Sequence, residues 1–274
     1  MRTDRVVRVS SVELSVGSID LFCFDHYMHA FPRHAHDSFT IGVFDGDNGV
    51  ISLARTSARA EDGAILAIAP DSIHSAEPKR DRGWTYRSMY PSRDLMSIAL
   101  ESSGADAQFD IPVINDDAIA AELLAIQVAL FKGITTLGIE ERLLVVLRSL
   151  VDRHATRSRQ PAPRSSTSAA SKARSYLEEN FSQPVKLDEL SLECGVSPFH
   201  LIRSFRDSIG MTPHAYLMQV RANRAREMLV GGEGISTVAY RCGFVDQSHL
   251  TRTFKRIFGV TPGAYYAGAR RALA

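Results

Sequence analysis

The chain has 274 residues with a formal net charge of +1, and 45% of its residues are hydrophobic. This length predicts about two domains. No run of about eighteen apolar residues occurs, and the charged residues 1–10 precede no hydrophobic stretch, so we expect neither a membrane span nor a secretory signal. Cys23, Cys194 and Cys242 form neither a CxxC pair nor an even-numbered disulfide framework. We therefore expect a cytoplasmic protein with reduced core cysteines and no membrane partner.

Residues 1–112 are predicted to form an all-β domain. Short runs rich in Val, Ile and Phe are separated by turn signals at residues 45–49, 61–63 and 70–71. Evenly spaced short strands of this kind are typical of a sandwich or a barrel.

Two groups of side chains in this domain are candidate binding residues. His34 and His36 are two residues apart, which places both on one face of an extended strand, where His74 from another strand would complete a triad. A second group, formed by Trp84, Tyr86 and Tyr90, alternates along a predicted strand. These aromatic residues either line a cavity or belong to the core, and the sequence leaves both interpretations open.

Residues 113–155 are predicted to form two amphipathic helices. Apolar residues recur at three- and four-residue spacing between positions 119 and 130 and again between 139 and 150, with Gly133 and Gly138 between the two sets. These helices cover the open side of the β domain, or pair two subunits as a homodimer, or do both.

Residues 156–171 are small and polar with two prolines and no apolar period, which predicts a flexible linker.

Residues 172–274 contain an internal repeat, which predicts two copies of one supersecondary unit. The offset is 48 residues up to a Cys-Gly pair and 49 after it, so the second copy has one extra residue in its turn. The matched positions are Leu187/Ile235, Leu190/Val238, Cys194/Cys242, Gly195/Gly243, His200/His249, Leu201/Leu250, Arg203/Arg252, Phe205/Phe254, Gly210/Gly259, Thr212/Thr261, Pro213/Pro262 and Tyr216/Tyr265.

Each copy has the pattern of a helix-turn-helix. In the first, Gly195 lies in the turn, and Ser197 and Pro198 open the next helix as N-cap and first-turn proline. In the second, Asp246 is the predicted N-cap. A long helix over residues 214–230, ended by two glycines, joins the copies. Its seventeen residues would span about 26 Å, of the order of the 34 Å that separates successive major grooves.

The second helix of each copy is predicted to bury one face and to expose a polar, basic face. Arginine and glutamine read base edges, whereas Arg206 and Lys255 are better placed for phosphates. The residues predicted to contact DNA are Phe199, Ile202, Arg203 and Arg206 in the first copy and Gln247, Ser248, Thr251, Arg252 and Lys255 in the second.

The charge distribution agrees with this interpretation. Residues 172–274 contain 14 Lys and Arg against nine Asp and Glu, whereas residues 1–171 contain 18 against 22. A basic domain joined to an acidic one is typical of a module that binds phosphates, because counterion release drives backbone binding. A helical bundle whose repeat serves only packing would not need the matched caps, turn glycines and basic faces together.

This segment resembles the DNA-binding domain of the AraC/XylS family of bacterial transcription regulators. The resemblance covers about one hundred residues, and it implies base contacts at Phe199, Ile202, Arg203, Gln247, Ser248, Thr251 and Arg252. It also implies RNA polymerase as a partner. Ile202 departs from the family pattern, which commonly has a polar residue there, so the first helix is expected to discriminate sequence less.

By the same resemblance, residues 1–112 are expected to form a cupin-like β-roll that senses a small-molecule effector. Metal-binding cupins usually carry a glutamate four or five residues after the second histidine, where this chain has Thr40 and Ile41. Glu77 is a possible substitute, but nothing in the sequence places it. We therefore expect no metal and no cofactor, and assign His34, His36 and His74 to a pocket or to hydrogen bonding.

The expected fold is α+β with two domains: a sensor over residues 1–112, a helical segment over 113–155, a linker over 156–171 and a DNA-binding domain over 172–274. The expected function is sequence-specific, effector-controlled transcription regulation without catalysis. Two alternatives are a cupin metalloenzyme tethered to DNA and an activator whose cellular amount alone sets its output. The effector, the operator and the sign of regulation are not encoded in recognisable form.

Overall fold

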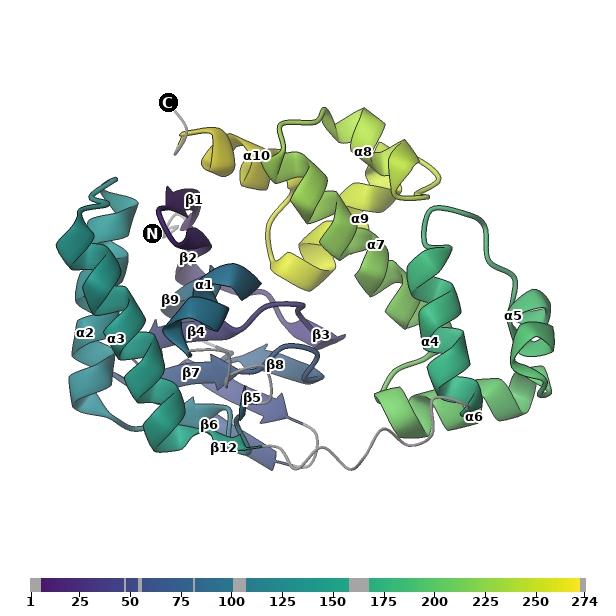
Figure 1. Cartoon of the computed structure of the whole chain (residues 1–274), viewed down its shortest axis with the longest axis horizontal. Coiled ribbons are helices and arrows are strands. Elements are labelled where there is room, and N and C mark those ends of the chain that lie inside the picture. Colours follow the sequence, from purple (N-terminus) through teal and green to yellow (C-terminus); the bar gives the residue numbers. More distant parts are fainter. Residues whose placement is uncertain are drawn as a thin grey trace. The chain divides into compact units, whose positions relative to one another are not determined.

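The computed structural model describes residues 6–46, 48–53, 56–80, 82–100, 107–157 and 168–271 (Figure 1). The chain divides into two compact units, one formed by Met1–Ser158 with Ala264–Ala274 and the other by Arg159–Gly263. The predicted α+β class is confirmed, with an antiparallel β domain first, helices after it, and a helical domain with two helix-turn-helix motifs last.

Among the described residues, the first unit contains three antiparallel sheets: one of six strands in the order β1-β2-β9-β4-β7-β11, one of four in the order β3-β8-β5-β6, and one of two, β10-β12. The predicted turns separate β4 from β5, β6 from β7 and β7 from β8. The strands are β1 (Val6–Leu14), β2 (Gly17–Tyr27), β3 (Phe31–His34), β4 (Thr40–Phe44), β5 (Gly49–Leu53), β6 (Thr56–Ala60), β7 (Ile65–Ile68), β8 (His74–Pro78), β9 (Trp84–Pro91), β10 (Ala107–Gln108), β11 (Val113–Ile114) and β12 (Thr156–Arg157).

Three helices cover one face of the six-stranded sheet: α1 (Arg93–Ala99), α2 (Asp117–Phe131) and α3 (Leu137–His154). The two predicted helices are thus observed as α2 and α3, which lie side by side along the sheet (Figure 1). Their buried leucines and isoleucines share a core with Ile41 and Met89 of the sheet. Covering the β domain is therefore one role of these helices.

The opposite face of the six-stranded sheet is aromatic. Successive side chains of a strand point to opposite faces, so on β9 Met89 packs in the helix-covered core while Tyr86 and Tyr90 lie on the other face. Tyr86 stacks on Phe24 of β2 with ring centroids 4.6 Å apart. Residues of both sheets surround one cavity on this face.

The second unit is helical. Its elements are α4 (Ala169–Glu179), α5 (Leu187–Cys194), α6 (Pro198–Ile209), α7 (Pro213–Val230), α8 (Ile235–Arg241) and α9 (Gln247–Phe258), and α10 (Pro262–Arg271) follows. The long joining helix was expected over residues 214–230 and is observed as α7, one residue longer. Helix α4 was not anticipated as an element, because its Ala- and Ser-rich beginning resembles a linker.

The expected linker, residues 156–171, is only partly described, since residues 158–167 lie outside the described residues. At one end, Thr156 and Arg157 form β12 and pair with β10. At the other end, the hydroxyl of Ser168 caps α4 by accepting a hydrogen bond from the backbone of Ser171 at 3.2 Å.

All three cysteines are buried and free, as expected from their spacing. Among the described residues, no helix combines the length and the apolar character that crossing a bilayer requires.

Candidate functional site

The first candidate site is the exposed face of α6. The side chain of Ser197 caps this helix by accepting from the backbone of His200, and Pro198 occupies its first turn. Leu201 and Phe205 are fully buried, which fixes the helix against its own unit. The predicted contact residues lie on the remaining face: Phe199 is 78% exposed, Arg203 and Arg206 are exposed, and Ile202 is half-buried.

The second candidate site is the corresponding face of α9. Asp246 caps the helix by accepting from the backbone N–H of His249 at 2.6 Å. Leu250 and Phe254 are fully buried, in the places of Leu201 and Phe205 in the first copy. The residues expected to contact DNA again lie on the other face: Gln247, Ser248, Arg252 and Lys255 are exposed and Thr251 is half-buried.

Hydrogen bonds orient two side chains on this face of α9. Ser236 donates to Oε1 of Gln247 at 2.9 Å, which leaves the NH₂ group of the amide as the part available to a ligand. Thr251 donates its hydroxyl hydrogen to the backbone oxygen of Gln247 at 2.8 Å. Thr251 therefore presents its methyl group rather than a donor on this face.

The turns before the two helices differ. Phe244 and Val245 stand where the first copy has Val196 alone, and Val245 is 88% exposed. Gly243, with a φ of +73°, lies so close to the loop after α4 that an added Cβ would be 2.6 Å from the carbonyl oxygen of Ser182. Gly195 has a similar φ of +69°, but nothing lies within 4 Å of its Cβ position.

Arg221 on α7 binds the loop after α4. It is 7% exposed, and its guanidinium donates to the backbone oxygens of Phe181 at 2.7 Å and Gln183 at 2.8 Å. Burial lowers the pKa of Arg221 from its ordinary value. The sequence expectations gave Arg221 no role of its own. Its four-residue spacing from Leu217 and Ala225, both buried, was the available signal that it faces inward.

The third candidate site is the cavity between the two sheets of the first unit. All six residues that sequence analysis proposed for effector binding line it: His34, His36, His74, Trp84, Tyr86 and Tyr90. The centre of a water-sized sphere can move through about 30 Å³ of this cavity. This is room for about two water molecules. Further walls that the sequence did not reveal include Phe31, Thr40, Phe44 and Ile51.

Two polar groups of the cavity wall, the indole N–H of Trp84 and the hydroxyl of Thr40, differ in whether they can form a hydrogen bond with a ligand. The indole N–H of Trp84 donates to the backbone oxygen of His29 at 2.7 Å, so Trp84 offers an apolar surface. Thr40 is 3% exposed, and its hydroxyl has no hydrogen-bond partner among the described residues. This hydroxyl is therefore a candidate polar anchor for a ligand. Burial raises the pKa of Tyr86 well above its usual value, which keeps its phenol protonated.

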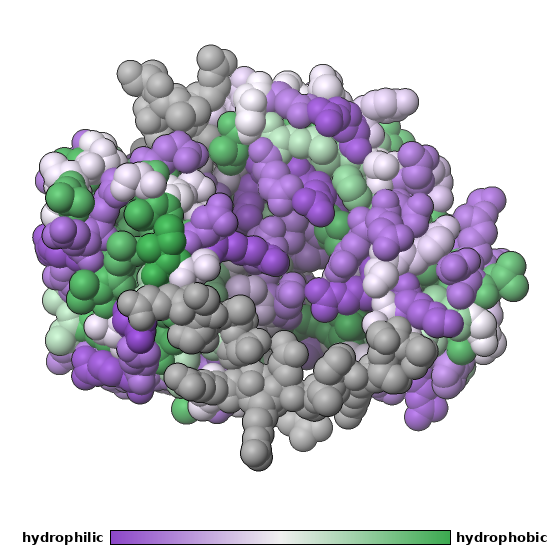
Figure 2. All heavy atoms as spheres, viewed as in Figure 1, coloured by the Kyte–Doolittle hydropathy of each residue, from purple (hydrophilic) through white to green (hydrophobic). Residues whose placement is uncertain are grey.

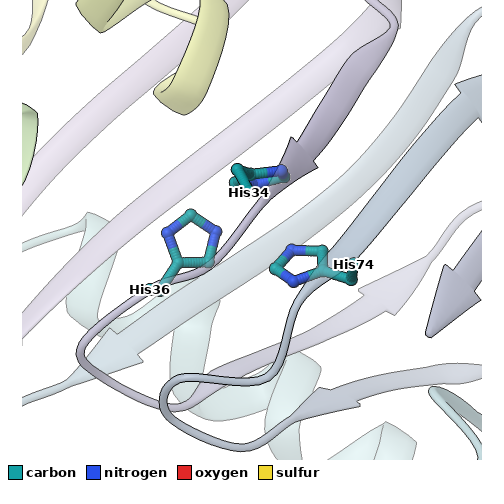
Figure 3. Close-up of side chains that lie close together, drawn as sticks. All are labelled: His34, His36 and His74. Carbon is teal, nitrogen blue, oxygen red and sulfur yellow. The ribbon is translucent and has the colours of Figure 1, made fainter. Parts of the chain in front are cut away.

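The three histidines of the cavity lie together (Figure 3). His34 at the end of β3 pairs directly with His74 at the start of β8, and His36 follows in the loop after β3. The ring centroids of His34 and His74 are 4.2 Å apart, and that of His36 lies 4.8 Å from the first and 5.2 Å from the second.

Burial sets the charge state of this cluster. Desolvation, together with the neighbouring His74, lowers the pKa of His34 well below its ordinary value. Desolvation also lowers the pKa of His74 to about 4. Both imidazoles are therefore neutral near pH 7. Glu77, the acidic residue that the sequence left unplaced, is exposed on β8 one position after the inward-facing Ala76, so it points away from the cluster.

Comparison with known proteins gives two family matches. Residues 17–147 match the model of an AraC-like ligand binding domain, and residues 190–268 match that of a helix-turn-helix domain.

Three relatives show how the similarity is distributed. The uncharacterized HTH-type transcriptional regulator YbfI of Bacillus subtilis (strain 168) is 29% identical over 237 residues, 84% of this chain and 85% of that protein. The regulatory protein Ada of Salmonella typhimurium is 48% identical over 65 residues, 24% of this chain and 18% of its own. The transcriptional activator RhaS of Klebsiella pneumoniae (strain 342) is 35% identical over 75 residues, 27% of each protein.

Among solved structures, ToxT from Vibrio cholerae O395 is similar over 97% of this chain and 98% of its own, with a TM-score of 0.56 and 14% identity. This likeness supports the two-domain fold.

Proposed function

The chain belongs to the AraC/XylS family of DNA-binding transcription regulators and carries an N-terminal ligand-binding domain, and from this premise we propose that a small-molecule effector controls its binding to a specific operator. The observation that carries the proposal is the pair of equivalent amphipathic helices, α6 and α9, whose apolar sides are buried and whose polar sides face solvent. The protein acts on DNA and needs no catalysis, and its place of action is the cytoplasm.

The DNA contacts divide into two kinds. Arg203, Gln247, Ser248 and Arg252 read base edges, and Phe199, Ile202 and Thr251 contribute apolar contact, since thymine presents a methyl group in the major groove. Arg206 and Lys255, farther along their helices, bind phosphates and position the domain. The eighteen residues of α7 span about 27 Å, of the order needed to hold two reading helices in successive major grooves.

The effector binds in the cavity between the two sheets. Its aromatic walls, its histidine cluster and the hydroxyl of Thr40 provide apolar surface with a few polar anchors, as small-molecule sites usually do. One ToxT structure contains an unsaturated fatty acid. The space open to the centre of a water-sized sphere is about 30 Å³, so we propose an effector that inserts one small group here.

Effector binding regulates by favouring one arrangement of the two domains, which requires different affinities for the arrangements. RNA polymerase is the partner through which a bound regulator acts on transcription.

A second copy of the chain is a further proposed partner, bound through α3. Leu137 and Val145 of this helix are 72% and 66% exposed, although both are apolar. Hydrophobic residues gather over the α2 and α3 side of the molecule (Figure 2). Because α3 already covers the sheet with its other side, a homodimer would use the face that remains.

Selection of genomic fragments bound by the full chain, followed by footprinting, tests the main proposal. One protected site with two contact regions about one helical turn apart is the expected result. Equal protection along all fragments would contradict sequence-specific binding. A thermal-shift screen of small metabolites tests effector binding, and the absence of any stabilising compound would favour an activator set by its abundance.

A further inference from the structure

We propose that His34, His36 and His74 form a three-histidine site for one divalent transition-metal ion of the Zn²⁺ class. The site goes beyond the effector role of the cavity and does not depend on it. Its starting observation is that one ligand nitrogen from each of these buried histidines lies within 4.8 Å of the other two. All three imidazoles face a common point between β3, β8 and the loop after β3 (Figure 3).

The distances suit a metal after a small adjustment. Zn²⁺ binds imidazole nitrogen at about 2.0 to 2.1 Å, so nitrogens of a tetrahedral site lie about 3.4 Å apart. Metal binding would therefore draw the ligand nitrogens closer together than their present separations of up to 4.8 Å. The direct pairing of His34 with His74 across two strands keeps two of the ligands in register.

Hydrogen bonds set the orientation of two of the rings. Nδ1 of His34 lies 2.7 Å from the backbone oxygen of Pro32, and Nδ1 of His74 lies 2.9 Å from that of Ser72. A carbonyl oxygen only accepts, so in each ring Nδ1 carries the hydrogen and Nε2 keeps its lone pair. Metal-binding histidines in proteins are held in this way by a partner of the second nitrogen.

The loop that carries His36 is also fixed. The backbone oxygen of His36 accepts a hydrogen bond from the backbone N–H of Asp71, 2.8 Å away. This bond joins the loop after β3 to the loop before β8.

The donor set determines the type of metal. Within the described part of the chain, the cluster contains three imidazoles and no carboxylate. Imidazole suits zinc, copper, iron and nickel, whereas magnesium and calcium require oxygen ligands. Three protein ligands leave a fourth position open, and Thr40 lines the same cavity as the three histidines. A water molecule or a small oxygen donor would occupy that position.

Metal titration of the full chain tests the proposal. The protein is purified without a polyhistidine tag, stripped with a chelator and titrated with ZnCl₂ by calorimetry, and separately with CoCl₂ by visible absorption. We expect one ion per chain, and cobalt bands with the intensity of a four- or five-coordinate nitrogen site. His34→Gln and His74→Gln should each weaken Zn²⁺ binding at least tenfold.

The control is His26→Asn, which changes an exposed histidine of the same domain. His26 has a φ of +49°, a conformation that asparagine tolerates, so the control should bind Zn²⁺ within twofold of the parent. Non-saturable binding, or equal binding by all variants, would overturn the proposal. Sulfur-to-cobalt charge-transfer bands would do so too, because they would place the ion on a cysteine. If the glutamine variants unfold, the cobalt spectrum of the parent chain still decides between these outcomes.

Discussion

The guanidinium of Arg221 on α7 donates to the backbone oxygen of Phe181, 2.7 Å away in the segment between α4 and α5. With the bond to the backbone oxygen of Gln183, this contact fastens the segment that precedes the first helix-turn-helix to the helix that joins the two copies. The domain therefore depends on a buried cation whose partners are backbone carbonyls rather than carboxylates.

Replacing Arg221 with methionine should lower the free energy of unfolding by about 2 to 3 kcal/mol, because two buried carbonyl oxygens lose a charged donor. Urea denaturation of the full chain, followed by circular dichroism, measures the change. Arg224→Met is the control: Arg224 is half-exposed and contacts Glu227 at 3.0 Å and the ring of Phe181. Its loss should cost less than about 1 kcal/mol, and an equal loss in both variants would contradict the role given to Arg221.

Two turn glycines should respond differently to alanine. Both have a left-handed backbone, which costs alanine about 1 to 2 kcal/mol. At Gly243 the new Cβ would also be 2.6 Å from the backbone oxygen of Ser182, whereas Gly195 has open space. Gly243→Ala should therefore be at least about 1 kcal/mol more destabilising than Gly195→Ala. The same urea experiment compares them, and equal effects would mean that the loop after α4 yields freely.

Arg252→Ala should weaken binding to the selected operator by about 1 to 3 kcal/mol and relax specificity at one base pair. Lys255→Ala should weaken binding to the operator and to random DNA alike, and flatten the salt dependence by about one counterion. Fluorescence anisotropy with both DNAs at several salt concentrations measures these effects. A loss on random DNA as large as on the operator would rule out base reading by Arg252.

Trp84 is the only tryptophan of the chain and lines the cavity, so its fluorescence reports on effector binding. Any compound that stabilises the chain in the metabolite screen should change this emission. Thr40→Val should weaken the binding of that compound about tenfold, because a polar anchor is lost. The same substitution should change the free energy of unfolding by less than about 1 kcal/mol. Ser88→Ala removes another buried hydroxyl without a partner among the described residues, outside the cavity lining, and should leave the affinity unchanged.

If α3 pairs two copies, Val145→Asp should weaken dimerisation at least tenfold, because a carboxylate would be buried in an apolar contact. Sedimentation equilibrium of the full chain measures the dissociation constant of the dimer. Ile98→Asp on α1, where the native side chain is 48% exposed, is the matched control and should dimerise normally. A parent chain that stays monomeric at high concentration would remove this proposal.

The sequence was most informative where local chemistry decides the structure. Ser197 and Asp246 mark helix starts by hydrogen bonds that span three residues, and Pro198 marks one by its fixed φ, so the starts of α6 and α9 were predictable. The beginning of α4 was not, because its stability comes from tertiary packing of residues such as Ala173 and Leu177 rather than from periodic large side chains.

The cavity was only partly predictable for a related reason. The spacing of His34 and His36 placed them on one face, but strand pairing, which sequence periodicity does not specify, brings His74 opposite His34. The role of Trp84, Tyr86 and Tyr90 stayed open for the same reason, since either face of β9 is buried. Thr40 gave no signal, because a lone hydroxyl in an apolar strand has no pattern.

The extra residue in the second turn, exposed as Val245 before the cap of α9, also bears on how DNA is read. The two copies follow one another head to tail along the chain and differ in their turns and in the chemistry of their outward faces. A single chain is therefore not self-complementary, and the half-sites it favours need not mirror each other. If the chain binds a specific operator as proposed, that operator has a polarity: inverting the same base pairs relative to the start of transcription would present the regulator facing the other way.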